Sequence, residues 1–573
     1  MTVHNMEIAN AFNRLANFLE IDDANPFRVR AYRHAARTIS SLSKDVADLI
    51  LEGQDLTELP GIGKDLAEKI KTLVKTGELP LLKEIESHHP AILSELMQIE
   101  GLGPKRIQVI YKKLKIKNMS DLKNSIVRGH LRELHGFGKK IEQKILQGML
   151  HHKKYTKRIL LSESWPIVNS IIHYIKKIKG ITAIECAGSF RRRKETIGDL
   201  DILVAAEHGE KVIHHFIHFN EVAEILSQGT TRSTVRLHSG IQVDLRVVKK
   251  KSYGAALVYF TGSKEHNIVL RKMAVQKKLK INEYGVFKNK THIAGRTEKE
   301  IYAAVGLPYI EPELREDRGE IEAAKKNQLP HLIELNDILG DLHCHTALTD
   351  GEDSLAIMAK AAFDAHYEYL AITDHSKHLT IAHGLDKKAV LKQIKLIDKI
   401  NAKSNKFVIL KSIEVDILED GSLDLQKNIL KELDLTVCSI HSKFNLSQTK
   451  QTERILRAMD NPYFNILAHP TGRLINQRES FTIDLEKIMF AAKERGCILE
   501  LNAQPKRLDL NDIHCKMAKS IGVKIAISSD AHSTNQLSHM QCGLYQARRG
   551  WLEKNDVINT LPIKALKKIL HRS

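Results

Sequence analysis

Three aspartates in the middle of this 573-residue chain are spaced as ligands of a two-metal site. Asp199 and Asp201 lie two residues apart in "GDLDIL", and residues at this spacing share one face of a strand. Two buried carboxylates side by side repel each other, so one takes up a proton unless cations neutralise them. Asp244, in the strand-like run "IQVDLRVV", is the natural third ligand. We expect the three to hold two Mg²⁺ ions; the alternative is a solvent-facing pair on an edge strand.

A second set of candidate ligands begins with "HCHTALTD" at residues 343–350. Its members are histidines and carboxylates that follow strand-like runs, and this mixture suits Zn²⁺, Mn²⁺ or Fe²⁺. One histidine in such a place is usually structural, but the complete set exceeds one tetrahedral or octahedral site. It therefore predicts a cluster of two or three ions that activates water and clamps a phosphate. The set consists of His343, His345, Asp350, His375, Glu414, His441, His469, Asp530 and His532.

Other polar residues of this part have different interpretations. Arg473 in "HPTGR" lies close to His469 in the sequence and is a candidate for holding substrate phosphate. Five further histidines lie off the ligand pattern, and we interpret them as surface or structural residues: His366, His378, His383, His514 and His539.

The elements that must position the second set are those of a parallel α/β barrel. From residue 340 onward, short β-rich runs such as "YLAITDH", "LTVCSIHS" and "KIAISSDAH" alternate with helical stretches. Polar residues recur at the ends of these runs, where barrels build their active sites. Residues 151–310 are mixed α/β, and the charge-dense segment 311–339 predicts a connector whose stiffness the sequence does not define.

The first 150 residues contain a threefold repeat. "LPGIGKDLAEKI", "IEGLGPKRIQVI" and "LHGFGKKIEQKI" each place Gly-x-Gly before a basic residue and a helical pattern. Such a turn exposes backbone N–H groups at the positive end of a helix, which suits a duplex phosphate backbone. The repeats resemble helix–hairpin–helix DNA-binding motifs. The predicted DNA-contacting glycines are Gly61, Gly63, Gly101, Gly103, Gly136 and Gly138.

Charge is distributed unevenly along the chain. The formal net charge is +19, and residues 1–320 carry 53 Lys and Arg against 38 Asp and Glu, whereas residues 321–573 carry 35 against 31. A polyanionic partner therefore belongs mainly to the first half, although a basic surface also serves solubility alone. The length predicts roughly three to four domains.

Cysteine usage and hydropathy favour a reducing cytoplasm. Six cysteines without a Cys-x-x-Cys pair argue against a disulfide framework or a cysteine zinc site. The N-terminus has no basic start followed by an apolar core, and no stretch of about 18 apolar residues occurs. We expect neither secretion nor membrane spanning.

The middle of the chain resembles the family X DNA polymerases, typified by DNA polymerase beta. The resemblance rests on residues 188–201, Asp244 and "YFTGSKEHNIVLR" at 259–271, in order and spacing. It implies a nucleotidyltransferase palm and thumb in which the three aspartates hold metal for attack of a primer 3′-hydroxyl on the α-phosphate of a dNTP. The residues it assigns to the dNTP are Gly188, Ser189 and Arg192 for the triphosphate, Tyr259, Phe260 and Gly262 for the sugar, and Asn267 and Arg271 for the base pair and template. Gln242 departs from the family, which has an arginine there, although Arg246 keeps a cation on the same strand face.

The N-terminal region resembles the small lyase domain of the same family. Lys69 in "GIGKDLAEKI" matches the lysine that attacks the aldehyde of a 5′-deoxyribose phosphate. A Schiff base requires a neutral amine, which nearby cations favour. Asp65 replaces one basic neighbour of the family pattern and weakens that help.

From about residue 338 to 573 the ligand motifs resemble the PHP (polymerase and histidinol phosphatase) domain, a distorted (β/α) barrel. The combination is that of bacterial family X polymerases. It implies gap filling in base excision repair, metal-dependent 3′–5′ exonuclease activity, and in some members AP-endonuclease or 3′-end-cleaning activity. We expect gapped or primer-template DNA and dNTPs as partners, no membrane, a monomer, and a cytoplasmic protein that joins the nucleoid during repair.

Domain boundaries follow from these assignments. We expect a multidomain α/β protein with a lyase-like helical domain at 1–90, a fingers-like helix–hairpin–helix domain at 91–150, a palm at 151–257, a thumb-like subdomain at 258–318, a linker at 319–337 and a PHP domain at 338–573. Two alternative functions remain open: a DNA-end-processing hydrolase with a non-catalytic polymerase platform, and a non-enzymatic repair scaffold.

Overall fold

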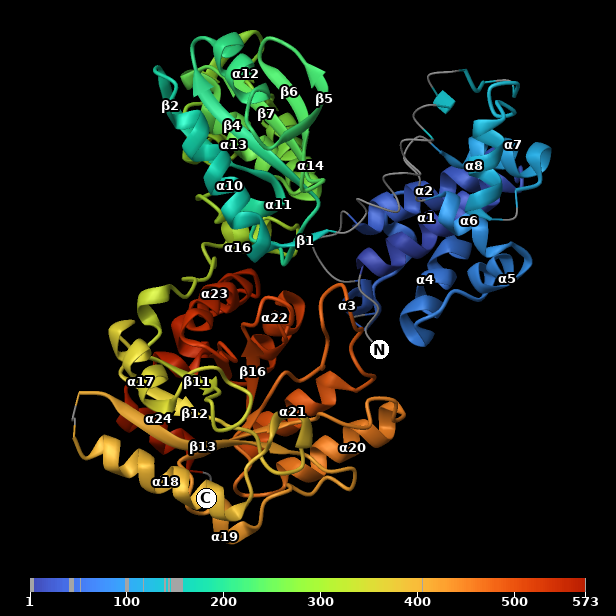
Figure 1. Ribbon diagram of the computed structural model, residues 1–573. Helices are drawn as coiled ribbons and strands as arrows, with labels where there is room; N and C mark the ends of the chain where they lie inside the picture. Colours follow the sequence, from blue (N-terminus) through green and yellow to red (C-terminus); the bar gives the residue numbers. More distant parts are fainter. Residues whose placement is uncertain are drawn as a thin grey trace.

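The computed structural model describes residues 5–40, 46–51, 53–97, 102–116, 118–134, 136–138, 141–142, 145, 158–403 and 406–571. They form a helical N-terminal region (blue in Figure 1), a palm and thumb (cyan to green) and a barrel (yellow to red). The predicted multidomain α/β fold is confirmed by this arrangement. No helix among the described residues combines the length and the apolar character that crossing a bilayer requires.

The N-terminal region is helical and has one hydrophobic core. Phe12 and Leu15 of its first helix are fully buried together with Ile107 and Ile110 from the second half of the region. The core therefore extends across both segments that the sequence suggests as separate domains. The described helices are α1 (Asn5–Ile21), α2 (Pro26–Ser40), α3 (Val46–Leu51), α4 (Lys64–Thr76), α5 (Pro80–His88), α6 (Ala91–Leu96), α7 (Pro104–Leu114) and α8 (Met119–Val127).

The palm is a five-stranded sheet in the order β2-β4-β7-β6-β5. Its central pair, β4 and β7, is parallel, and the other neighbours are antiparallel. The sequence of β4, DLDILVAA, changes from polar to apolar, so its start reaches solvent while its last five residues are buried. The elements are β1 (Ile159–Leu160), α10 (Leu161–Lys176), β2 (Ile181–Cys186), α11 (Gly188–Arg191), β3 (Thr196–Ile197), β4 (Asp199–Ala206), α12 (Gly209–Ile217), β5 (Val222–Gln228), β6 (Arg232–Leu237) and β7 (Gln242–Val248).

The thumb follows through a helix that is apolar on all sides. This helix, α13, contacts β4 of the palm as well as β8, β9 and α15 of the thumb, which is why YGAALVYFT carries no charged residue. The thumb elements are α13 (Tyr253–Thr261), α14 (Lys264–Gln276), β8 (Lys280–Asn282), β9 (Gly285–Lys288), β10 (Thr291–Ala294) and α15 (Glu298–Val305).

The segment between thumb and barrel is anchored rather than loose. Its elements are η3 (Pro312–Leu314), α16 (Glu320–Lys325) and η4 (Leu335–Asp337). Arg315 is fully buried and pairs with Glu298 at 2.7 Å, and buried Glu320 lies 2.7 Å from His266 Nδ1. Arg318 pairs with Asp512 of the barrel at 2.9 Å. The charge density of this segment therefore reflects ion pairs within and between domains.

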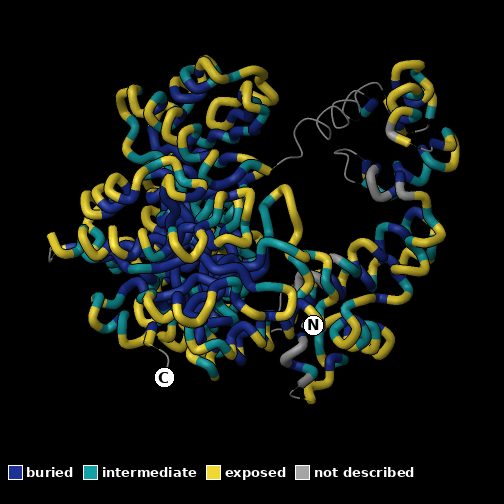
Figure 2. The backbone as a smooth tube through the Cα atoms, turned by 60° about the horizontal axis from the view of Figure 1, so that its bottom comes forward, coloured by how far each residue is buried: buried dark blue, intermediate teal, exposed yellow. Residues whose placement is uncertain are grey.

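The barrel contains seven parallel strands among the described residues, ordered β11 to β17 as in the sequence. Most are buried along their whole length, as Figure 2 shows in dark blue, which explains their continuous apolar runs. The strands are β11 (Gly340–Cys344), β12 (Tyr369–Ile372), β13 (Val408–Asp416), β14 (Leu435–Ser439), β15 (Ile466–Leu467), β16 (Ile498–Asn502) and β17 (Ile525–Ser528). The helices are α17 (Leu355–Asp364), α18 (Lys387–Asn401), α19 (Lys427–Leu430), α20 (Gln448–Met459), α21 (Leu485–Arg495), α22 (Asp512–Ile521), α23 (Met540–Arg549) and α24 (Ile563–Leu570).

One buried amide spans the seam between the first and last strands. Asn559 accepts a hydrogen bond from the Ile527 N–H at 2.8 Å and donates to the carbonyls of Ile527 and Gly340, also at 2.8 Å. A bridge between Cys344 and Ala531 joins the same two edges. The side chain of Asn559 thus brings β17 and β11 together and nearly closes the barrel.

Replacing Asn559 by alanine should lower the free energy of unfolding by about 3 kcal/mol, because buried backbone groups on both strands lose their partners. Urea unfolding followed by tryptophan fluorescence measures the effect. Asn555→Ala, an exposed position in the same segment, is the control. Equal stability of the two variants would show that the seam does not depend on this amide.

Two candidate metal centres and a candidate DNA-binding region

The three predicted aspartates of the palm lie together at the start of its central strands. Asp201 on β4 is the register partner of Asp244 on β7, and Asp199 precedes Asp201 on the same face. Burial, together with the charges of Asp199 and Asp244, raises the pKa of Asp201 to about 7. Divalent cations remove this repulsion, so the donor set fits the two-metal site that the spacing predicts.

Asp244 is held by three neighbouring side chains. Thr234 donates to its Oδ1 at 2.5 Å, Gln242 donates to its Oδ2 at 2.7 Å, and Arg232 forms an ion pair at 3.3 Å. Gln242, the departure from the family pattern, therefore contacts the third carboxylate directly. Arg246 instead lies over the ring of Phe260, 4.6 Å from its centre.

The loop after β2 approaches Asp201 so closely that it requires glycine. Gly188 has a φ of +59°, and a Cβ atom there would lie 2.3 Å from Asp201 Oδ2. The absent side chain lets the start of α11, with Ser189, lie against the carboxylates. This positions Ser189 and Arg192 beside the candidate metal site.

One cavity of about 420 Å³ brings the predicted dNTP residues together. Asp199 and Asp201 lie at its wall, and cations that the sequence reading missed, Arg158, Lys194 and Lys264, contribute as well. Lys194 and Lys264 each lie two residues from a predicted one, Arg192 and Gly262, whereas Arg158 is distant in sequence and only the fold brings it to the cavity. The predicted residues that line the cavity are Gly188, Ser189, Arg192, Tyr259, Phe260, Gly262, Asn267 and Arg271.

The thumb side of this cavity is an ordered aromatic and amide wall. The rings of Tyr259 and Phe260 meet edge to face, with centres 5.1 Å apart. Asn267 donates from Nδ2 to the carbonyl of Tyr259 at 2.7 Å, and Arg271 donates from Nε to the carbonyl of Asn267 at 3.2 Å. The first of these hydrogen bonds links the start of α14 to the end of α13, and the second lies within α14.

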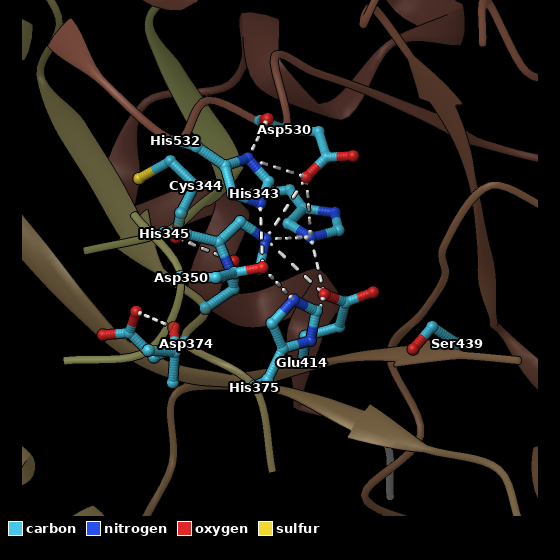
Figure 3. Close-up of polar contacts among 12 residues, drawn as sticks. His343, Cys344, His345, Asp350, Asp374, His375, Glu414, Ser439, Asp530 and His532 are labelled. Atoms are coloured by element: carbon cyan, nitrogen blue, oxygen red, sulfur yellow. Dashed lines mark hydrogen bonds and ion pairs between the residues drawn. The ribbon is translucent and has the colours of Figure 1, made fainter. Parts of the chain in front are cut away.

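The nine predicted ligands of the barrel converge at the ends of its strands, as Figure 3 shows for most of them. Three groups offer ligand atoms that lie within 4.8 Å of one another. The groups share His345 and His375, so they form one cluster rather than separate sites. They are His345, Asp350, His375 and His532; His343, His345 and Asp530; and His375, Glu414 and His441.

Glu414 is the centre of this cluster. Its Oε2 lies 3.0 Å from His375 Nδ1 and 3.3 Å from His343 Nε2, while its Oε1 lies 3.2 Å from His469 Nε2 and 3.4 Å from His441 Nε2. One carboxylate therefore faces histidines on both sides, the arrangement of a bridging ligand. His469, which belongs to none of the three groups, joins the cluster through this contact.

Electrostatics favour cations in the cluster. Burial and the neighbouring His375 lower the pKa of His345 to about 3, so its imidazole is neutral and available as a ligand. Burial alone would raise the pKa of Glu414, but His375 and His343 hold it well below the usual range. The same pairing raises the pKa of His375 to about 10 and that of His441 to about 9, so protons on these imidazoles supply the positive charge that the ionised Glu414 requires. Two or three divalent ions would supply that charge in place of the protons.

A second layer of residues orients the ligands. Glu500 accepts from His343 Nδ1 at 2.7 Å and from the His469 N–H at 2.6 Å, and Asp416 lies 3.0 Å from His441 Nδ1. Such contacts fix the ring orientation and leave the other nitrogen for a metal. The sequence reading missed Glu500 and Asp416, although both lie on the same strand ends, in "LELNA" and "IEVDI".

The phosphate-binding prediction for Arg473 is wrong. Its guanidinium forms a bidentate pair with Glu195 of the palm, at 2.7 and 3.2 Å, and so faces the other domain. Arg507 is the arginine next to the cluster, with Nε 3.6 Å from Asp530 Oδ2. The five histidines read as surface or structural belong to none of the ligand groups among the described residues.

The glycine repeats form matching helix starts where they are described. Gly63 and Gly103 cap α4 and α7 with nearly the same backbone angles, φ −86° and ψ 174° or 165°. Gly61 and Gly136 both have positive φ, 77° and 86°. Open space surrounds the Cβ positions of Gly63, Gly103, Gly136 and Gly138, so a DNA backbone can approach. Gly101 lies outside the described residues.

Lys69 lies on α4 behind this turn and is not free. Its ammonium forms an ion pair with Asp65, one helical turn earlier. A cavity of about 540 Å³ next to it is lined by Arg28, Tyr32 and Lys64 among others. Asp65, which replaces a basic residue of the family pattern, therefore contacts the candidate nucleophile directly.

Known proteins share these parts in the same order. Residues 158–258 and 256–316 match the DNA polymerase beta palm and thumb, 3–79 match a helix-hairpin-helix domain, and 93–148 match a SAM-like helix-hairpin-helix tandem. The DNA polymerase/3′-5′ exonuclease PolX of Bacillus subtilis (strain 168) is 36% identical over 100% of both chains. The chain belongs to the family X DNA polymerases. The predicted family is thereby confirmed.

Two further relatives of this family X polymerase cover parts of it. A probable phosphatase of Thermoanaerobacter sp. (strain X514) is 32% identical over 38% of this chain and 89% of its own length. DNA polymerase lambda of Rattus norvegicus is 25% identical over 55% of this chain and 57% of its own length. The phosphatase match agrees with the PHP-like barrel.

Glu414→Gln should weaken Mn²⁺ binding to the barrel by about 100-fold, because the bridging negative charge is lost. Isothermal titration of the full chain with Mn²⁺ measures this. Glu419→Gln, at an exposed position beyond the same strand, is the control and should bind as the unaltered chain does. Unchanged binding by Glu414→Gln would contradict a bridging role.

Proposed function

We propose that the chain is a DNA-directed DNA polymerase that fills short gaps in base excision repair and carries a 3′–5′ exonuclease in its barrel. The observation that supports the polymerase most strongly is the single cavity that contains two of the three aspartates and every predicted dNTP residue. Its five cations, Arg158, Arg192, Lys194, Lys264 and Arg271, match a triphosphate and a phosphodiester backbone. The PolX relative carries both activities in its name.

In the palm, different side chains of the cavity contact the metal ions, the triphosphate and the sugar. Divalent ions bound by Asp199, Asp201 and Asp244, most simply Mg²⁺, supply Lewis acidity and offset phosphate charge. Ser189 and Arg192 hold the triphosphate beside them. Tyr259 and Phe260 present a wall to the sugar, which leaves little room for a 2′-hydroxyl.

Asn267 and Arg271, on the next helix, lie where the nascent base pair and template pass. Their hydrogen bonds to α13 and α14 hold them in register with the sugar wall. The assignment of these two residues follows the family resemblance and their place at the rim of the cavity.

In the barrel, the ligand cluster supports phosphodiester hydrolysis at a DNA 3′ end. A cluster of two or three ions, Mn²⁺, Zn²⁺ or Fe²⁺, supplies an activated water and a clamp for phosphate. Arg507 adds a fixed cation at the edge of the cluster. AP-endonuclease or 3′-end-cleaning activity at the same site uses the same chemistry.

The proposal also covers DNA binding, the domain boundaries, the oligomeric state and the place of the protein in the cell. The Gly-x-Gly turns bind the backbone of gapped or primer-template DNA. The domain boundaries lie near residues 90, 150, 257, 318 and 337. The protein acts as a monomer in the bacterial cytoplasm, at the nucleoid, as fits its full-length similarity to a bacterial relative.

Two single substitutions should separate the activities on one-nucleotide-gapped, end-labelled DNA. Asp201→Ala should slow primer extension by about 10³-fold, since several kcal/mol of charge stabilisation are lost, and leave 3′ degradation intact. His345→Ala should slow 3′ degradation and leave primer extension intact. Gel analysis with Mg²⁺ and with Mn²⁺ measures both reactions.

Each variant is the control for the other in this assay. Nuclease activity that survives His345→Ala would remove the hydrolase assignment from the barrel. If the unaltered chain degrades ends but extends no primer, a DNA-end-processing hydrolase replaces the polymerase proposal.

Lys69→Ala should abolish borohydride trapping on a 5′-deoxyribose-phosphate substrate if this lysine forms the Schiff base. Asp65→Asn should raise the trapping rate about twofold, because an exposed i,i+4 ion pair no longer holds the ammonium. Lys71→Ala, on the same helix, is the control. Trapping that persists without Lys69 would assign the reaction to another amine.

A further inference from the structure

One buried arginine of the barrel reaches the triphosphate-binding side of the palm. Arg549, at the end of α23, is only 4% exposed. Its NH2 group pairs with Asp512 of the barrel at 2.6 Å, while its NH1 group donates to Glu316 at 3.0 Å and to the carbonyl of Arg192 at 2.7 Å. One guanidinium therefore contacts the barrel, the segment between thumb and barrel, and the segment that carries the predicted triphosphate residues Ser189 and Arg192.

Glu316 is shared between the barrel and the cavity. The same Oε1 that accepts from Arg549 accepts from Arg192 Nε at 3.0 Å, and Oε2 lies 4.0 Å from Lys194. Both Arg192 and Lys194 line the candidate dNTP cavity. Glu316 therefore forms ion pairs with two of the cations that line the cavity.

The charges alternate along this contact. Arg318, Asp512, Arg549, Glu316 and Arg192 follow one another as partners of opposite sign. Burial would raise the pKa of Glu316, but Arg549 and Arg192 lower it to about 2, so the carboxylate is ionised. The series has three cations and two anions, and the cation at its palm end, Arg192, lines the cavity.

Loss of Arg549 would change this balance. Glu316 would then be neutralised mainly by Arg192 and Lys194, with a smaller contribution from Arg318, and the two cavity cations would be drawn away from an incoming triphosphate. Arg192 would also lose the contact that orders its backbone carbonyl. A triphosphate would then compete with Glu316 for the guanidinium of Arg192, which costs binding free energy.

We propose that Arg549 of the barrel is a positioning residue for the triphosphate site of the palm and acts through Glu316 on Arg192. This inference rests on the proposed polymerase function. It means that the barrel contributes to nucleotide binding by a route independent of its own metal cluster.

The neighbouring arginine offers a matched control. Arg548, on the same helix, pairs with Glu313 of the connector at 2.8 Å and donates to the Ile333 carbonyl at 3.1 Å. It too ties barrel to connector, but through Glu313 instead of Glu316. Arg548→Gln therefore removes an interdomain ion pair without touching the partners of Arg192.

The test compares Arg549→Gln and Arg548→Gln in the full chain by steady-state gap filling. Arg549→Gln should raise the KM for dNTP about tenfold, equivalent to about 1.4 kcal/mol of binding free energy, with kcat and the KM for gapped DNA within about twofold. The inhibition constant of pyrophosphate should rise in parallel. Arg548→Gln should leave all of these values unchanged.

Arg549→Lys is the conservative variant, and it tests the inference if Arg549→Gln does not fold. It keeps the charge but cannot bridge three partners, so the KM for dNTP should rise about threefold, against no change in Arg548→Lys. Thermal unfolding midpoints show that each variant is folded. Equal KM values for the variants at 548 and 549, or a loss of kcat without a change in KM, would overturn the inference. An unaltered chain that fails to extend would instead overturn the proposed function.

Discussion

The need to neutralise buried carboxylates is the constraint on which both catalytic regions depend. In the palm, the parallel pairing of β4 and β7 places Asp201 opposite Asp244, with Asp199 on the same face. In the barrel, strand ends place Glu414 and Asp530 among histidines. In the palm the carboxylates repel one another and must take up a proton or cations, whereas in the barrel the charges of Glu414 and Asp530 are offset by imidazoles. Strand pairing strong enough to hold them together therefore creates two sites that favour divalent metal.

The interface between these regions is built from the same kind of interaction, but with its charges satisfied by the protein. Arg473 binds Glu195, which lies in the loop that leads to Asp199, and Arg549 shares Glu316 with Arg192. Each pair links a segment that carries palm-site residues to the barrel. The contact between barrel and palm thus uses charged residues that are next to, or belong to, the palm site.

The sequence predicts the features that depend on residues near one another in the chain, and the structure adds contacts between residues that are far apart in it. Spacing and strand patterning were sufficient to predict the parallel barrel and the gathering of the three aspartates and of the nine barrel histidines and carboxylates, because these depend on neighbours and on strand ends. Arg473 was misread since its partner, Glu195, lies 278 residues away and leaves no trace in the local pattern. The anchoring role of Glu316 was missed for the same reason: an acidic residue in a charge-dense segment looks solvated until its buried partners are known.

Manganese-edge anomalous diffraction from crystals of the full chain grown with Mn²⁺ tests the central claim most directly. The account predicts anomalous peaks at about 2.0–2.3 Å from carboxylate oxygens of Asp201 and Asp244, and two or three further peaks around Glu414. Peaks at Glu414 alone would contradict a metal-dependent palm. The absence of peaks at both places would contradict the view that divalent metal neutralises the buried carboxylates of the two sites.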